Sequence, residues 1–168
     1  MTKKLFFLLK VFILFLLSIN ISLADLQKNL INKLAATQTL TFDFKQKIAD
    51  KEEIGNCFVK YPLLMKCNYK NSKGKTIISN GKTVAIIKKK YKKIYLYPIK
   101  STPLFFILEK EKIINLIRKS NSYELNSDLI GFIFSDKKTN KVSFEINNLK
   151  INNQLIDDFF KIPQEKDL

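Results

Sequence analysis

Hydrophobic residues recur with two different spacings along the chain. In residues 25–36, Leu26, Leu30 and Leu34 lie at helical spacing, which predicts a short amphipathic helix. In residues 40–48 apolar and polar side chains alternate, which predicts a strand with one solvated face. A helix this short is unstable alone in water, so we expect it to dock on another element.

A β-hairpin with its own covalent link is predicted for residues 55–69. Two runs of β-forming residues flank Tyr61-Pro62-Leu63, and proline favours a turn because it fixes φ and cannot donate a hydrogen bond to a neighbouring strand. Cys57 and Cys67 lie symmetrically about this turn, so they would face each other across the hairpin. A non-hydrogen-bonded antiparallel pair has about the Cβ separation that a disulfide requires.

Further strands are predicted at regular spacing and are joined by tight turns, one of them at residues 71–74. The Asn80-Gly81 pair is typical of a type I′ hairpin turn, which needs positive φ at both central residues. The apolar side changes near Asn147-Asn148, which indicates a β-bulge. Strands of this kind predict a strongly curved antiparallel sheet or partial barrel, and they span residues 76–78, 84–87, 94–99, 123–125, 129–134 and 142–151.

The segment 102–119 interrupts the strands. Thr102-Pro103 has an N-cap residue followed by proline, the usual sequence of a helix start. Residues 104–108 are all apolar, and the charged run 109–112 separates them from a second apolar group, which predicts two helical pieces or one long helix. Such a segment must be covered on more than one side, or it closes over an apolar ligand.

Residues 1–24 have the pattern of a secretory signal peptide. Three lysines precede the apolar run 11–17, which is too short to span a bilayer, and the small residues Ser22 and Ala24 predict cleavage after Ala24. Cleavage would leave residues 25–168 as a single domain. The alternative is an uncleaved N-terminal anchor. No cysteine lies directly after the apolar run, at the cleavage site, so a lipid-anchored lipoprotein is not expected.

Export changes what the two cysteines predict. In an oxidising compartment, two thiols more often pair than bind metal or act as nucleophiles. We therefore expect a disulfide between Cys57 and Cys67, the only cysteines of the chain. Closing a loop of this size would stabilise the fold by roughly 2–3 kcal/mol in the chain-entropy model.

The net charge of +15 falls to +12 when the three lysines of residues 1–24 are removed. A charge of this size suggests nucleic acid or anionic lipid as a partner. However, Arg118 is the only arginine, and abundant lysine, asparagine and isoleucine are typical of an A/T-biased coding sequence. Lysine also replaces arginine poorly in bidentate phosphate recognition, so nucleic acid is not an expected partner.

The chemistry of the side chains argues against an enzyme. The chain has no histidine, which removes the commonest general base and metal ligand. It also contains no Gly-rich phosphate loop and no carboxylate cluster with metal-ligand spacing. We therefore expect no catalytic residues, no metal and no cofactor.

The order of these elements resembles the LolA family of periplasmic outer-membrane lipoprotein carriers, from about Leu26 to Pro163. Each matching motif is short, but their order and spacing together are specific. After the signal peptide and the amphipathic helix, the motifs are Phe42-Asp43-Phe44-Lys45-Gln46, Gly55, Lys60-Tyr61-Pro62-Leu63-Leu64-Met65, Ser79-Asn80-Gly81-Lys82-Thr83, Thr102-Pro103 and Phe160-Lys161-Ile162-Pro163.

The resemblance implies an α+β fold in which a strongly curved antiparallel sheet forms an incomplete β-barrel covered by helices. It also implies a periplasmic monomer that holds lipoprotein acyl chains in an apolar cavity. Such a carrier would take its cargo from an inner-membrane ABC-type release complex and pass it to an outer-membrane acceptor. Alternatives are a periplasmic phospholipid- or glycolipid-binding module, a sensor domain of the same fold, and a structural protein with a filled core.

The cavity and lid implied by the resemblance would be lined by apolar side chains, for each of which ordinary core packing is the alternative. They are Phe42, Phe44, Met65, Leu104, Phe105, Phe106, Leu108, Ile113, Leu116, Phe132, Phe134 and Phe144. Lys60 and Tyr61 occupy the gate position, where Tyr61 stands in place of the family's usual basic residue. Cys67 stands where the family usually has tryptophan, and Met65 where it usually has an aromatic residue. The region between the Thr-Pro helix and the last strands is short for the family.

The signal peptide can be tested by mass. We expect the protein recovered from a periplasmic fraction to begin at Asp25, because the small residues before it suit signal peptidase. Intact-mass measurement of the exported protein would check this. A membrane-bound product that retains residues 1–24 would instead identify an uncleaved anchor.

Overall fold

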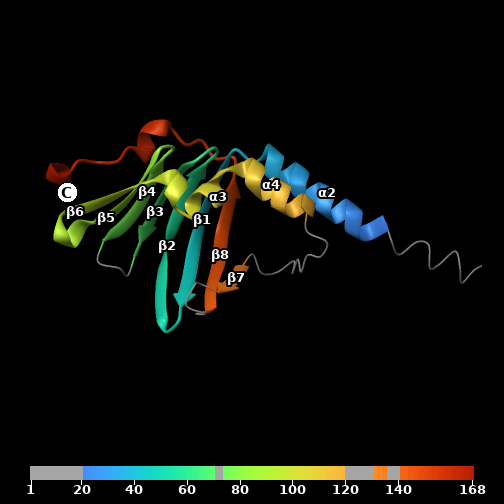
Figure 1. Ribbon diagram of the computed structural model, residues 1–168, viewed down its shortest axis with the longest axis horizontal. Helices are drawn as coiled ribbons and strands as arrows, with labels where there is room; N and C mark the ends of the chain where they lie inside the picture. The colour runs from blue at the N-terminus through green and yellow to red at the C-terminus, as the bar shows by residue number, and fades with distance from the viewer. Residues whose placement is uncertain (1–20, 71–73, 120–130, 136–140) are drawn as a thin grey trace, which may run out of the picture. The chain divides into compact units, whose positions relative to one another are not determined.

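The computed structural model divides into two compact units, residues 1–36 and 37–168. In the first unit, helix α2 (Ile21–Ala36) begins four residues before the predicted start at Asp25, because Ile21 to Ala24 contain no helix-breaking residue. Figure 1 shows the residues that the structure describes, and these are 21–70, 74–119, 131–135 and 141–168. The predicted turn at 71–74, except Gly74, and the predicted strand 123–125 lie outside them.

The second unit is an α+β structure built on one curved, antiparallel sheet that does not close on itself (Figure 1). Eight strands are present in the described ranges, in the order β6-β5-β4-β3-β2-β1-β8-β7. This arrangement confirms the predicted antiparallel sheet, while the incomplete barrel remains a prediction. The strands are β1 (Thr39–Ile48), β2 (Lys51–Lys60), β3 (Leu64–Tyr69), β4 (Lys75–Asn80), β5 (Thr83–Lys88), β6 (Lys93–Pro98), β7 (Gly131–Ser135) and β8 (Lys141–Ile151).

The β2–β3 hairpin has the predicted register. Cys57 is directly opposite Cys67, and a disulfide joins them with an S–S distance of 2.05 Å and a Cα–Cα distance of 4.1 Å. The short Cα–Cα distance is typical of a non-hydrogen-bonded antiparallel pair. The turn between the strands contains a cis Tyr61–Pro62 peptide bond, followed by Leu63 at φ 66°.

The β4–β5 turn corrects the predicted turn type. Strand β4 includes Asn80, so the two central residues of the turn are Gly81 and Lys82. Gly81 has φ +93° and Lys82 does not have positive φ, which is the pattern of a type II′ turn. The Asn80 side chain explains the difference. Its Oδ1 accepts hydrogen bonds from the backbone N–H groups of Lys82 (3.1 Å) and Thr83 (2.9 Å), which holds Asn80 at the end of β4.

Two helical pieces follow β6 and the 3₁₀ turn η2 (Ile99–Ser101), as one of the two sequence alternatives predicted. Helix α3 (Leu104–Leu108) and helix α4 (Lys110–Lys119) are separated by Glu109, which has extended backbone. The predicted Thr102 N-cap is wrong. Its hydroxyl donates to the backbone oxygen of Ile99 at 2.8 Å, and Pro103 stands at the N-cap position.

The predicted β-bulge in the last long strand is confirmed. The register of β8 against β1 shifts between Thr41 and Asp43, and Asn148 has φ 53°. The Asn148 amide donates to the Asp43 carboxylate at 2.8 Å, which holds the irregular position against β1.

The C-terminal segment is folded, although residues 164–167 are all polar or charged. It contains the 3₁₀ turns η3 (Asp157–Phe160) and η4 (Glu165–Asp167). Phe160 is 1% exposed, and Leu168 packs with Ile162 against a buried cluster of Ile78, Ala85 and Ile87. The last residues contribute to the core because an apolar side chain follows the charged ones.

The sheet therefore has two differently covered faces. We call the face that α3 contacts the inner face, and the face that the C-terminal segment contacts the outer face. On the outer face, the Phe159 ring contacts the Phe58 ring edge to face, with centroids 4.9 Å apart. Side chains alternate between the two faces along each strand, as the period of two in the sequence predicted.

Gly55 is required for the packing of the inner face. A Cβ at this position would lie against the backbone oxygen of Asn68 and 2.7 Å from the Phe44 ring. We expect Gly55→Ala to lower the free energy of unfolding by about 2 kcal/mol or more, because the β2 and β3 backbones cannot separate without breaking the hairpin.

The control is Gly81→Ala, which introduces strain at positive φ but meets only the Leu64 side chain, at 3.7 Å. It should cost about 1 kcal/mol. Urea denaturation of both variants measures the difference, and equal losses would contradict the packing role of Gly55.

Candidate functional site

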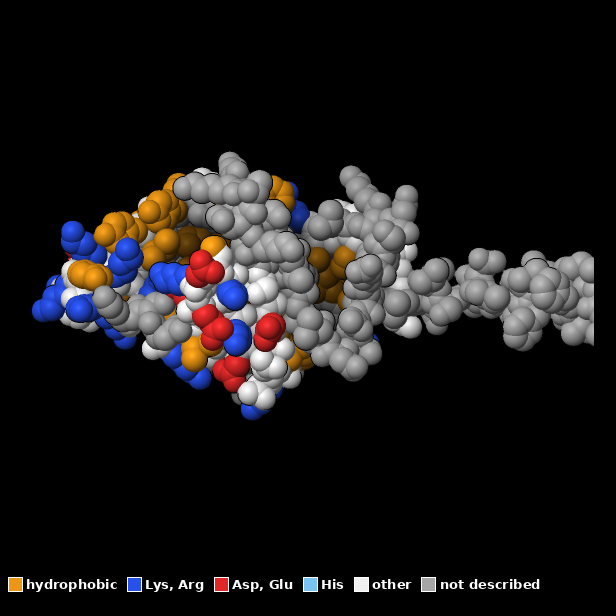
Figure 2. Space-filling view, turned by 90° about the horizontal axis from the view of Figure 1, so that it is seen from below, with side chains coloured by type: hydrophobic (Ala, Val, Ile, Leu, Met, Phe, Trp, Pro, Cys, Tyr) orange, Lys and Arg blue, Asp and Glu red, His pale blue; other side chains and the backbone are white. Residues whose placement is uncertain are grey.

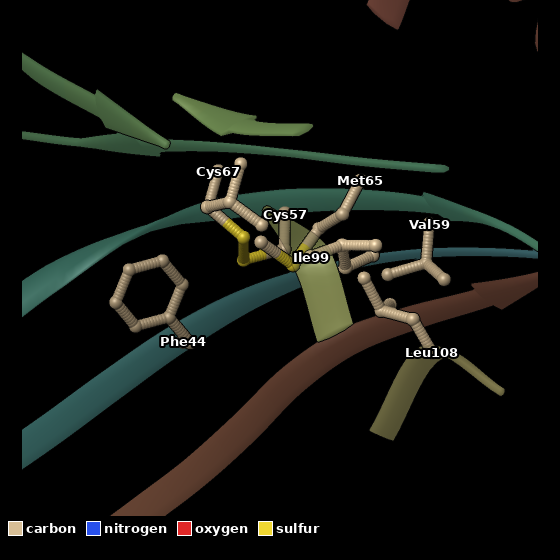
Figure 3. Close-up of a cluster of buried hydrophobic side chains, with 8 residues drawn as sticks. Phe44, Cys57, Val59, Met65, Cys67, Ile99 and Leu108 are labelled. Carbon is tan, nitrogen blue, oxygen red and sulfur yellow. A yellow bond between two sulfur atoms is a disulfide. The ribbon is translucent and has the colours of Figure 1, made fainter. Parts of the chain in front are cut away.

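The inner face carries a buried apolar cluster, which we call the inner cluster. Figure 3 shows its side chains converging from β1, β2, β3, η2 and α3, with the disulfide among them. Because the disulfide faces inward, its sulfur atoms form part of this apolar surface. The inner cluster consists of Phe44, Cys57, Val59, Met65, Cys67, Val84, Ile99 and Leu108.

Most of the predicted lining residues gather here. Phe44, Met65 and Leu108 belong to the inner cluster, and four more predicted residues pack against it, namely Phe42, Leu104, Phe105 and Phe144. The Phe44 and Phe144 rings stack with centroids 5.4 Å apart. The side chains of Leu116, Phe132 and Phe134 lie outside the described ones.

Two of the predicted lining residues, Phe106 and Ile113, do not belong to the inner cluster. Phe106 is 62% exposed, because the short helix α3 turns Phe105 toward the sheet and its neighbour away from it. In α4 the buried residue is Ile114, at 2% exposure, while Ile113 is only partly buried. The sequence prediction therefore placed the buried face of α4 at Ile113, one residue before the residue that is buried.

Sequence reasoning missed several members of the inner cluster. Val59 lies two residues after Cys57 on the same strand, so the period of two could have identified it. Ile99 and Val84 gave no such signal. Ile99 follows β6 in a 3₁₀ turn, and only the fold brings it beneath α3.

The turn at residues 61–63 joins the sheet to helices α3 and α4, which we call the cover. The backbone N–H of Leu63 donates to the backbone oxygen of Leu108 at 3.1 Å, where α3 ends. The Ser79 hydroxyl, which is fully buried, donates to the backbone oxygen of Leu63 at 2.6 Å. These bonds place the end of α3 directly over the hairpin turn.

Lys60 and Tyr61 point to different surroundings. The Lys60 ammonium pairs with the Asp157 carboxylate at 2.7 Å, on the side of the C-terminal segment. The Tyr61 ring packs against the inner cluster, and burial raises the pKa of its phenol. Tyr61 is therefore neutral at physiological pH, so the cover meets an uncharged side chain here.

The ammonium group of Lys110, in the cover, lies near the same turn. Lys110, the first residue of α4, donates from Nζ to the backbone oxygen of Thr37 at 2.7 Å. Its Nζ lies 5.4 Å from the centroid of the Tyr61 ring, within the range of a cation–π contact. The positive charge near the turn is thus provided by the helical segment.

A buried polar cluster, unforeseen from the sequence, lies at the β1–β2 turn end of the inner face. Glu53 is only 7% exposed, and its carboxylate oxygens lie 2.7 and 2.8 Å from Lys75 Nζ and 2.8 Å from Gln46 Nε2. Lys75 Nζ also lies 3.6 Å from the Tyr69 ring centroid. Burial, with the negative charge of Glu53, raises the pKa of Tyr69 to about 12.

Within the described residues, no group of three His, Cys, Asp or Glu side chains could hold a metal ion. Among those residues, likewise, no helix has the length and apolar character needed to cross a bilayer. The inner face is an apolar surface. The ion pair of Glu53 and Lys75 lies at one end of it, and the cover lies at the other.

An antiparallel sheet with one apolar face beneath short helices defines a protein suited to enclosing apolar groups. Residues 35–156, well over half of the chain, match the model of the family described as outer membrane lipoprotein carrier protein LolA. The chain belongs to the LolA family. Members of this family are periplasmic carrier proteins, not enzymes. A search of curated proteins found no match.

The raised pKa of Tyr69 predicts an alkaline effect on stability. The folded pKa of about 12 exceeds the unfolded value of about 10. Stability should therefore be unaffected by this group below about pH 10 and fall by about 2 kcal/mol as the pH rises toward 12. Denaturant titrations at several pH values should show a shallower decline for Tyr69→Phe. Tyr91→Phe, at an exposed tyrosine, should leave the decline unchanged; equal slopes in all three proteins would contradict the role of Tyr69.

Proposed function

We propose that this protein holds the acyl chains of lipoproteins against its inner face and moves them from the inner to the outer membrane. The observation that carries the proposal is the small helical cover over the inner cluster. Helix α3 has five residues, of which Leu104, Phe105 and Leu108 contact that cluster. Family membership supports the same role.

The free energies of apolar burial are consistent with a cover that an acyl chain can displace. Withdrawing three large apolar side chains from the sheet costs on the order of 6 kcal/mol. An acyl chain gains roughly 0.8 kcal/mol per buried methylene, so about eight methylenes would offset that cost. Cover and cargo therefore compete at similar free energy, which suits a protein that must also release what it binds.

Tyr61 and Lys110 would act at the gate. Opening the cover at the turn would break the bond between the Leu63 N–H and the Leu108 oxygen and separate Lys110 from the Tyr61 ring. Neither contact involves a buried ion pair. The hairpin side of this gate would thus be uncharged, because Tyr61 stands in place of the basic residue usual in the family.

The partners that follow from this role are acylated lipoproteins, an inner-membrane ABC-type release complex and an outer-membrane acceptor. Lipoprotein acyl chains are the ligand; the two membrane components would supply and receive them. We further propose that the protein acts as a periplasmic monomer and that the disulfide keeps the floor of the cavity rigid. A phospholipid- or glycolipid-binding module and a sensor domain of the same fold are the competing roles.

Adjacent phenylalanines offer a matched test of acyl binding. Phe105 packs on the inner cluster, whereas Phe106 is exposed. We expect Phe105→Ala to weaken binding of a fluorescent fatty acid roughly tenfold, through lost apolar contact, and Phe106→Ala to change it less than twofold. Equal effects of the two variants, with unchanged thermal unfolding, would contradict binding beneath α3.

Release of lipoproteins from spheroplasts tests the cargo. Adding the purified protein should release newly made acylated lipoprotein into the medium, and the protein should co-purify with it. Release that proceeds equally without the protein would refute the carrier role. Extraction of phospholipid with no dependence on lipoprotein would instead identify a lipid-binding module.

A further inference from the structure

One edge of the sheet combines positive charge with exposed apolar side chains. We call residues 88–97 the lysine–tyrosine edge. Five lysines and Tyr91 occupy positions 88–93, through the turn η1 (Lys89–Tyr91), and all six side chains are exposed. Tyr91 is 54% exposed between Lys90 and Lys92.

Within the described part of the chain, no carboxylate lies within 4.0 Å of any ammonium in positions 88–93. The Lys88 ammonium instead lies 5.3 Å from the Tyr95 ring centroid. Lys89 contributes to the lowered pKa of Lys66, after burial, which indicates positive potential around this edge. The carboxylate of Glu165 contacts the edge only through the Ile94 N–H.

Strand β6 exposes apolar side chains on both of its faces at once. Tyr95 and Tyr97 are 40% and 44% exposed on the inner face, and Leu96 is 60% exposed on the outer face. This is possible because β6 is an edge strand with no further strand beside it in the described sheet. In Figure 2, hydrophobic and basic side chains gather together at the end of the molecule where β6 lies.

The backbone of this edge is poorly suited to pairing with another strand. The Ile99 N–H donates to the Lys82 oxygen, so the alternate residues of β6 form the hydrogen-bonded pairs with β5, and the backbone groups of Ile94, Leu96 and Pro98 point outward. The Ile94 N–H already donates to Glu165 at 3.2 Å, and proline has no N–H. Leu96 alone retains an outward N–H, so strand addition by a second chain would gain little.

We propose that the lysine–tyrosine edge binds the surface of a bilayer that contains anionic phospholipid. Lysines attract anionic headgroups without needing a fixed geometry, and tyrosine rings favour the level of the headgroups. An acidic protein partner fits less well, because this edge has no arginine for bidentate carboxylate pairing. Contact would hold the protein beside a membrane and would leave the inner cluster, whose residues all lie outside 88–97, free for cargo.

Vesicle flotation tests the charge. The full chain, as recovered from the producing cells and with its N-terminus determined by mass, should float with vesicles of phosphatidylcholine and phosphatidylglycerol. It should float much less with phosphatidylcholine alone or in high salt. Replacing Lys89, Lys90 and Lys92 together by glutamine should weaken binding roughly a hundredfold, at about fivefold per lysine.

The matched control replaces Lys47 on β1, Lys70 just after β3 and Lys150 on β8 by glutamine. These lysines are exposed and the change in net charge is identical. Binding by this control should fall less than threefold. Equal loss in both triple variants would show that only net charge matters, and would overturn the proposal.

A tryptophan reporter tests which surface enters the headgroup region. The chain contains no tryptophan, so Tyr91→Trp provides a single fluorophore at the edge and Ile156→Trp one at another exposed site. On addition of anionic vesicles, the Tyr91→Trp emission should shift to the blue and the Ile156→Trp emission should not. Shifts at both sites, or at Ile156→Trp alone, would place the contact elsewhere and refute the proposal.

Other occupants of this edge have distinct signatures. Sedimentation that shows a dimer abolished by the Lys89/Lys90/Lys92 variant, without vesicle binding, would assign the edge to a second copy and refute the membrane role. The proposal is independent of acyl carriage. Loss of vesicle binding in the lysine variant with retained fatty-acid binding separates the two surfaces.

Discussion

The pairing of β2 with β3 determines what the inner face of this protein can contact. One register places Cys57 opposite Cys67 and Val59 opposite Met65, all four side chains on the same face. A shift of either strand by one residue would turn its apolar side chains to the outer face and point Lys60 or Lys66 at the inner face. The disulfide prevents that shift covalently, because its Cα–Cα distance of 4.1 Å fits only directly opposed residues.

The cover over this face depends on the same hairpin. Leu63, in the turn of this hairpin, accepts a hydrogen bond from the Ser79 hydroxyl and donates one to the Leu108 oxygen at the end of α3. The turn is thus bonded both to the sheet and to the short helix above it. At the far end, the buried Glu53 pairs with the half-buried Lys75, which keeps a polar boundary beside an apolar surface without an unpaired charge.

Sequence patterns were most reliable where local geometry decides the outcome. The hairpin register and the bulge at Asn148 follow from spacing and turn residues, and the break between α3 and α4 is one of the two alternatives that the charged run allowed. The predictions failed where a side chain had competing partners. Asn80 caps the turn that it was expected to form, and the Thr102 hydroxyl bonds to Ile99 in place of the helix that it was expected to cap.

The sequence by itself determined the antiparallel sheet, the paired cysteines, the resemblance to lipoprotein carriers and the absence of histidine chemistry. These features depend on the period of two, on symmetry about Pro62 and on composition, all of which are local or additive. Only the tertiary structure decided that Ile99 lies under α3, that Phe105 and not Phe106 faces the sheet, and that the last residues cover the outer face. Those outcomes depend on contacts between segments far apart in the chain, where packing of the whole fold selects among locally equivalent choices.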